Sequence, residues 1–154
     1  MKKLIFIFLF ISSAFASKAQ NDVAGTQAVQ MLKEFYIAYN TAWSTTHNGY
    51  VLIKKLDSLQ EKYCTLSLRK ELKKEFKRVG LDHDELINDE FTDVAHLNTL
   101  RVTIDKNKPN NYIVYYTVFD KDASNKPIQI KIVIQVTVVK ERGSFKIASV
   151  KGIH

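Results

Sequence analysis

The sequence predicts an α+β domain in which three N-terminal helices pack on a curled antiparallel sheet of about four strands. Apolar residues recur at steps of three and four in the first half of the chain, which is typical of amphipathic helices. In the second half they alternate with period two, which is typical of strands. Because the helices precede the strands instead of alternating with them, the sheet is expected to be antiparallel, and 154 residues make one domain.

The N-terminus has the pattern of a secretory signal peptide. Two lysines after the first methionine precede an apolar run over Leu4–Ile11, and small residues follow it. A helix of this length spans about 12 Å, less than half of a hydrocarbon core of roughly 30 Å, so no stable membrane insertion is expected. Cleavage after Ala16 and cleavage after Ala19 both fit, and the second is favoured because polar residues follow it. We therefore expect a signal peptide over 1–19 and a single domain over 20–154, periplasmic or extracellular.

Three helices are expected in the mature part. The first covers about 25–44, and turn-forming residues separate it from a second helix over 50–63. Thr65 offers the N-cap of a third helix, and Gly80 is expected to end that helix.

Four strands are expected after the helices, over about 100–105, 112–119, 128–138 and 145–150. The third shows the clearest alternation, with isoleucine or valine at every even position. It is about twice as long as a typical strand, so we expect it to be curled or bulged.

Composition and residue counts argue against several classes of partner and functional site. The formal charge of +7 falls to +4 once the three lysines of the signal peptide are removed, which argues against a nucleic-acid partner because such partners need a concentrated basic footprint. The single cysteine excludes an intramolecular disulfide, and the four histidines lack metal-ligand spacing. No motif of a serine hydrolase, zinc protease or phosphate-binding loop occurs. We expect no metal and no cofactor.

Two charged segments lie in the middle of the chain. Six acids fall between residues 82 and 93, where calcium binding is disfavoured because Leu86 and Ile87 occupy EF-hand positions for a ligand and a glycine. The alternative is that Asp82 caps a short helix whose apolar side docks on the core. The preceding helix has a basic face, for which a solvated surface is the alternative to a binding role. The candidate partner-binding residues are Asp82, Asp84, Asp89, Glu90, Lys70 and Lys74.

Aromatic residues gather on the first helix and the second strand. If this helix lies across a curled sheet, some of them line the concavity and form an apolar pocket edged by phenolic hydroxyls. Core packing is the alternative for each. The candidate ligand-binding residues are Tyr36, Tyr39, Trp43 and Tyr116.

A motif of two parts resembles a known bacterial family. Lys62-Tyr63-Cys64-Thr65 precedes the basic helix, and the stretch 81–88, Leu-Asp-His-Asp-Glu-Leu-Ile-Asn, follows it. Together they are similar to the signature of the exported domain of unknown function 3828, with Glu85 in place of the family's proline and Glu90-Phe91 in place of its Gln-Asp step. The order of elements also resembles the nuclear transport factor 2-like (cystatin-like) cone. The resemblance implies that fold and an exported location, and no established activity.

These observations favour a non-enzymatic binding or interaction module, monomer or homodimer, whose partner is a protein or small ligand of the cell envelope. One alternative is a periplasmic immunity-type protein that blocks a toxin through the acidic or the basic segment. The other is a small enzyme of the isomerase or dehydratase kind that uses the pocket, with Asp89 or Asp93 as base and Tyr116 as proton donor.

Overall fold

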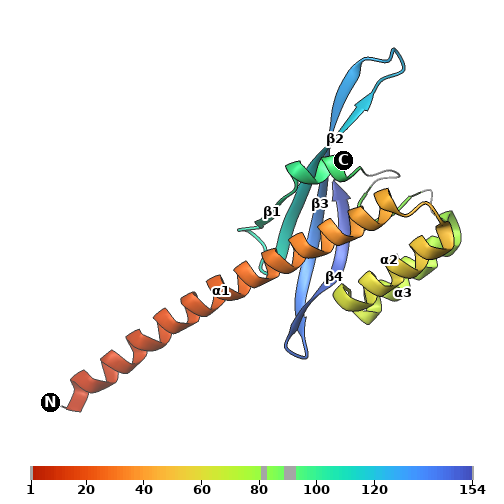
Figure 1. Ribbon diagram of the computed structural model, residues 1–154. Helices are drawn as coiled ribbons and strands as arrows, with labels where there is room; N and C mark the ends of the chain where they lie inside the picture. The colour runs from red at the N-terminus through yellow and green to blue at the C-terminus, as the bar shows by residue number, and fades with distance from the viewer. Residues whose placement is uncertain (1, 81–82, 89–92, 154) are drawn as a thin grey trace.

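The computed structural model describes the backbone of residues 2–80, 83–88 and 93–153, and the side chains from residue 24 onward. The described residues form, in chain order, α1 (Lys2–Thr45), α2 (Gly49–Tyr63), α3 (Leu66–Val79), the 3-10 helix η1 (Val94–Thr99), β1 (Arg101–Ile104), β2 (Asn111–Lys121), β3 (Pro127–Glu141) and β4 (Ser144–Ile153). The strands pair antiparallel in the order β1-β2-β3-β4, and the sheet is open (Figure 1). The predicted α+β class with four antiparallel strands is confirmed.

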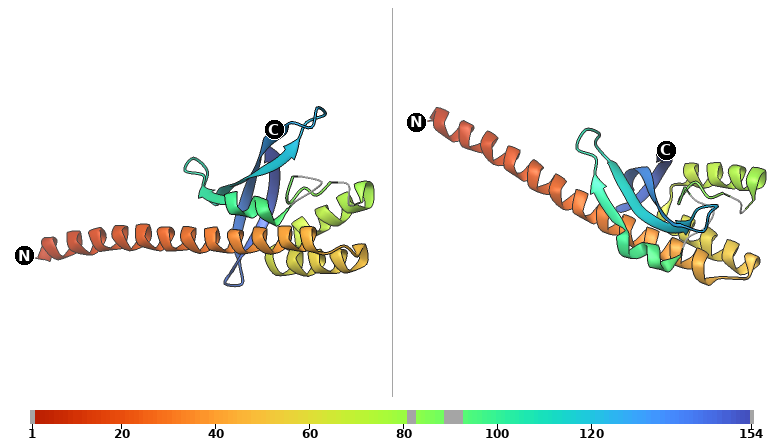
Figure 2. Two further views of the ribbon diagram at one scale, coloured as in Figure 1. Left: turned by 45° about the horizontal axis from the view of Figure 1, so that its top comes forward. Right: turned by 90° about the horizontal axis from the view of Figure 1, so that it is seen from above.

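The helices pack against the sheet and against one another. α1 crosses one face of the sheet, and α2 and α3 lie side by side near the C-terminal end of α1 (Figures 1 and 2). α1 begins well before the predicted start, at Lys2, because no glycine or proline interrupts the sequence before Gly25. Gly25 allows a close approach to β1, since a Cβ at this position would lie 3.0 Å from Cδ1 of Ile104.

The ends of the shorter helices follow the local sequence. The Asn48 side chain accepts a hydrogen bond from the Val51 N–H and caps α2, and the Thr65 hydroxyl accepts one from the Leu68 N–H and caps α3. α3 ends at Gly80, whose φ of 69° is a conformation that glycine adopts without strain. The predicted cap and the predicted stop of the third helix are both confirmed.

The long strand β3 is bent by an irregularity in its pairing with β4. The register shifts between Thr137 and Val138, which pair with Ser149 and Ile147, so that Ala148 is passed over. The predicted bulge is therefore present, and its extra residue lies on the partner strand. An extra residue of this kind increases the local twist and curls the sheet.

A 3-10 helix that the sequence did not predict covers the edge of β2. β1 pairs with this strand only as far as Tyr115. Beyond that point the Thr117 N–H donates to the Thr99 hydroxyl at 2.8 Å, and the Phe119 N–H faces Nε2 of His96 at 3.3 Å. Nδ1 of His96 faces the Asp93 N–H at the same distance. Because a neutral imidazole has one acceptor nitrogen, only one of these two N–H groups is satisfied at a time.

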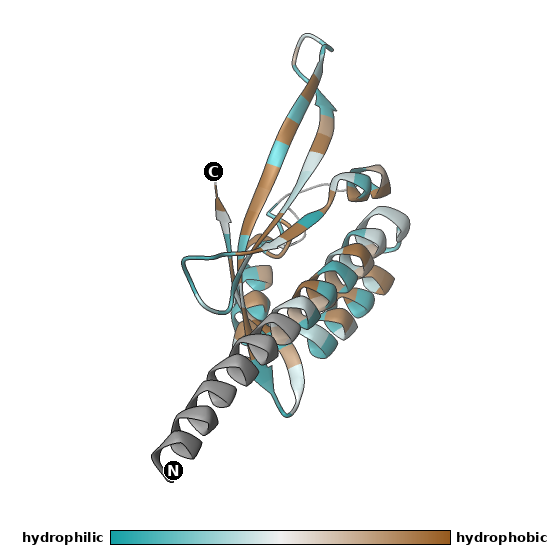
Figure 3. Cartoon of the chain, turned by 90° about the vertical axis from the view of Figure 1, so that its left-hand side faces the viewer, coloured by the Kyte–Doolittle hydropathy of each residue, from teal (hydrophilic) through white to brown (hydrophobic). Residues whose placement is uncertain are grey.

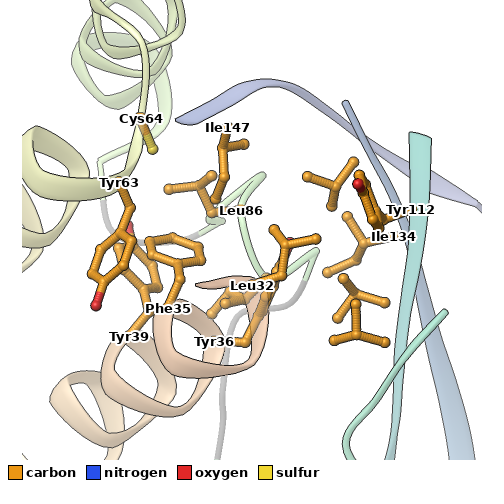
Figure 4. Packing of buried hydrophobic residues seen from close by; sticks show 14 of the residues in the cluster. Leu32, Phe35, Tyr36, Tyr39, Tyr63, Cys64, Leu86, Tyr112, Ile134 and Ile147 are labelled. Carbon is orange, nitrogen blue, oxygen red and sulfur yellow. The ribbon is translucent and has the colours of Figure 1, made fainter. Parts of the chain in front are cut away.

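The core lies between α1 and the inner face of the sheet. Fully buried side chains of α1, among them Leu32 and Phe35, meet fully buried strand residues such as Ile134 and Ile147, and Figure 4 shows these groups pointing toward one another. Leu86 is buried in the same cluster, as is its neighbour in sequence, which confirms that the apolar side of the acidic segment docks on the core.

Cys64 belongs to this core as well. Its side chain is buried, and burial raises the pKa of the thiol to about 12. The thiol therefore stays protonated at physiological pH and behaves as a small apolar group.

The β2–β3 hairpin extends beyond the helices (Figure 1). Hydrophobic and hydrophilic residues alternate along it (Figure 3). Ile134 and Ile130 lie on the same face of β3, but Ile134 is fully buried whereas Ile130 is 42% exposed. The predicted apolar face of this strand is thus covered only toward its C-terminal end.

The difference in burial between Ile134 and Ile130 predicts the stability of two matched variants. Ile134→Ala is expected to lower the free energy of unfolding by about 2–5 kcal/mol, because it leaves a cavity in the core. Ile130→Ala is expected to lower it by less than about 1 kcal/mol, because water already reaches the side chain. Urea unfolding of the two variants measures both values, and equal losses would place the core boundary elsewhere along β3.

Candidate functional site

A pocket of about 330 Å³ lies among α1, α2, α3 and the segment after α3. Its apolar wall comes from Trp43, Ile53, Leu56, Leu72 and Phe76. Its charged lining consists of Asp57, Lys73, Glu75, Lys77, Asp84 and Glu85, joined by the imidazole of His83. No described strand residue contributes to this pocket. The sequence predicted a pocket in the concavity of the sheet, but the side chains of α1 and of the acidic segment fill the space in front of the sheet.

The Asp84 carboxylate is the centre of a hydrogen-bond network in the wall of this pocket. Its Oδ2 accepts hydrogen bonds from the Tyr39 hydroxyl at 2.8 Å and from the Trp43 indole N–H at 3.2 Å. Its Oδ1 accepts one from the Leu86 N–H at 2.9 Å. The Tyr39 hydroxyl in turn accepts a hydrogen bond from the Gln60 side-chain amide at 3.0 Å. Residues from α1, α2 and the acidic segment therefore share one polar network.

Local sequence explains how these groups meet. Tyr39 and Trp43 are four residues apart on α1 and project from one face of the helix. Asp84 accepts from the N–H two residues ahead, the pattern of an Asx turn, and this turn directs the carboxylate toward α1. Leu86 and Ile87, both fully buried, hold the turn on the core.

Burial dominates the electrostatics of this network. It raises the pKa of Asp84 above its ordinary value of 3.8, although the three hydrogen bonds to the carboxylate act in the opposite direction. Burial and then the Asp84 charge raise the pKa of Tyr39 well above 10.0, so the phenol stays protonated and donates. Among the described residues the ion pairs join Arg69 to Glu61 and Arg78 to Glu75, and no cation pairs with Asp84.

The four aromatic candidates divide into two pairs. Tyr39 and Trp43 line the pocket, whereas Tyr36 and Tyr116 are buried in the core and do not. The Tyr116 hydroxyl donates to the carbonyl of Ile87 at 2.7 Å. The Tyr36 hydroxyl is buried with no hydrogen-bond partner among the described residues, and burial raises its pKa well above 10.0.

The charged candidate residues also differ in where they lie. Lys70 and Lys74 are exposed on α3 and do not line the pocket, while Asp84 turns inward. The other candidates, Asp82, Asp89 and Glu90, lie outside the described residues.

Sequence reasoning did not select Gln60 or Phe76, which line the pocket from α2 and α3. Both occur in helical patterns that indicate nothing beyond an amphipathic surface. Their role depends on how the helices pack together.

The described part of the chain offers neither a metal site nor a membrane-spanning helix. No group of three or more histidine, cysteine, aspartate or glutamate side chains is arranged to hold a metal ion. No helix there has the length and apolar character needed to cross a membrane.

Two tyrosines on the same helix provide a matched test of the network. Tyr39→Phe removes a donor from a partly buried carboxylate, so we expect the free energy of unfolding to fall by about 1.5–3 kcal/mol. Tyr36→Phe removes a buried hydroxyl that has no described partner, so stability is expected to stay constant or to rise by up to about 1 kcal/mol. Chemical denaturation compares them, and similar losses in both variants would contradict the network.

The raised pKa of Asp84 predicts a pH dependence of stability. The folded chain holds this proton more tightly than the unfolded chain, so the contribution to stability is fully present below pH 3.8 and is lost as the pH rises through the raised pKa. The stability of Asp84→Asn relative to the parent is therefore expected to increase with pH across this window. Urea midpoints measured between pH 4 and pH 8 test the sign, and a relative stability that decreases with pH would show that the pKa is lowered.

Comparisons with known proteins support the fold. The chain matches no protein-family model and no curated protein. It is similar to the crystal structure of a protein of unknown function from Bacteroides thetaiotaomicron, with a TM-score of 0.70 and 23% sequence identity. The match covers 90% of this chain and 98% of the other. At this identity the similarity establishes a shared fold.

Proposed function

We propose that this chain is an exported, non-enzymatic binding module that holds a small ligand in the pocket among α1, α2 and α3. The observation that carries the proposal is the Asp84 carboxylate, which is held in place by Tyr39 and Trp43 in the wall of an otherwise largely apolar pocket. A small number of fixed polar groups in an apolar cavity is the usual composition of a ligand site, and the volume of about 330 Å³ falls within the usual range.

Export and family are part of the same proposal. The N-terminal pattern of lysines, apolar run and small residues supports secretion. Helices on one face of a bent four-stranded sheet support a nuclear transport factor 2-like fold, and the motif around Asp84 supports a relationship to the domain of unknown function 3828.

An acid–base enzyme is the second candidate, because a carboxylate with a raised pKa in a cavity is a common property of catalytic sites. The pair expected from the sequence does not support it. Asp93 is exposed and caps η1, while the Tyr116 hydroxyl is buried and donates to a backbone carbonyl. Asp84 itself shares a hydrogen bond with Tyr39, whose phenol remains protonated. This arrangement favours a fixed binding group over a proton-transfer pair.

The pocket contains its own optical probe, because Trp43 is the single tryptophan of the chain and lines the cavity. We expect the uncharged dye N-phenyl-1-naphthylamine to bind and to quench Trp43 emission. Phe76→Ser is expected to weaken binding about tenfold, which corresponds to roughly 1.4 kcal/mol and to the loss of an apolar wall.

Ile130→Ser is the matched control, because Ile130 is 42% exposed and Phe76 41%, and only Phe76 lines the pocket. This control is expected to bind the dye with unchanged affinity. Equal loss in both variants, or no quenching in the parent, would argue against a ligand site at this position.

A further inference from the structure

We propose that the pocket selects a ligand with a protonated amine at one end of an apolar body, and that the Asp84 carboxylate is the counter-ion of this amine. The inference rests on the proposed function, since it assumes that the pocket holds a small ligand. It adds the chemical class of that ligand and the residue that selects it.

The hydrogen-bonding capacity of the Asp84 carboxylate is not fully used by the described residues. A carboxylate offers about four acceptor positions, and the described residues use three of them. All three donors are neutral groups, so they orient the carboxylate without neutralising its charge. A partly buried charge without a paired opposite charge is unfavourable, and an ammonium group that reaches it supplies both the missing charge and a hydrogen-bond donor.

The distribution of charge around the cavity also favours a cationic ligand. Among the described residues, four carboxylates, two lysines and the imidazole of His83 line it. Lys73, Lys77 and His83 are exposed, whereas Asp84 is fixed in the wall next to the buried ring of Tyr39. An anionic ligand that fills the cavity brings its charge toward Asp84, while a cationic one is attracted to it.

The apolar wall of the pocket fits the rest of such a ligand. Leu56, Leu72 and Phe76 line the same pocket and offer a surface for an alkyl or aryl body. Burial of this body supplies affinity, and the charged end supplies selectivity.

A matched series of probes tests the inference. Octan-1-amine, octan-1-ol and octanoate share one alkyl chain and differ in the charge of one end. At pH 8, isothermal titration calorimetry and Trp43 emission are expected to show the amine binding at least tenfold more tightly than the alcohol, and octanoate binding most weakly. Calorimetry is needed because substitutions at Asp84 alter the surroundings of Trp43 directly.

Two variants test whether Asp84 is responsible for the preference for the amine. Asp84→Asn keeps the size of the side chain and removes its charge, so the affinity for the amine is expected to fall to that of the alcohol, with binding of the alcohol retained. Glu71→Gln removes one charge from an exposed position on α3 that does not line the pocket, and should leave the preference unchanged. An equal effect of both variants would mean that overall charge selects the ligand, which overturns the role of Asp84.

The outcomes separate the inference from the proposed function. Equal affinity for amine and alcohol, or tightest binding of octanoate, overturns the inference while leaving a ligand-binding pocket in place. Binding of none of the three probes, nor of the uncharged dye, removes the proposed function as well. If Asp84→Asn does not fold, the affinities of the three probes for the parent chain and for Lys73→Gln still test the inference. The inference requires the amine to be the tightest ligand of both chains.

Discussion

The carboxylate of Asp84 connects parts of the chain that are far apart in sequence. Through Tyr39 and Trp43 it joins the segment after α3 to the middle of α1, and through Leu86 it fixes the turn in that segment. The turn brings two apolar residues into the core between α1 and the sheet. Without the hydrogen bonds from Asp84 to α1, this segment would no longer be held beside the helices. The pocket would then lose the wall that the segment forms.

Contacts with α1, β2 and β4 hold the short segment 84–88 in place. Its acidic side chain bonds to α1, while the carbonyl of Ile87 accepts a hydrogen bond from Tyr116 on β2. Asn88 lies against Gly152 of β4, where a Cβ would come within 2.1 Å of the Asn88 side chain. Polar groups thus position a segment whose apolar residues then fill the core. The two functions of the segment, closing the core and supplying a charge to the pocket, follow from one turn.

Most of the helices and strands could be predicted from the sequence, whereas the site could not. Periodicity located the helices before the strands, Thr65 and Gly80 marked the ends of α3, and the long alternation of β3 indicated a bulge. The 3-10 helix η1 was missed because six residues are too few to establish a period. The pocket was expected in front of the sheet because local patterns indicate that aromatic residues share a helix face. They do not indicate that Asp84, 41 residues after Trp43, turns inward to meet that face.

The role proposed for Asp84 requires a partly buried, ionisable carboxylate that forms no ion pair among the described residues. The most direct measurement is the pKa of Asp84 in the folded chain, obtained from the pH titration of its carboxyl carbon by NMR. We expect a value above 3.8 in the free protein and a decrease when octan-1-amine is added. A value at or below 3.8 in the free protein would show that the charge is already compensated, and would contradict the role assigned to Asp84.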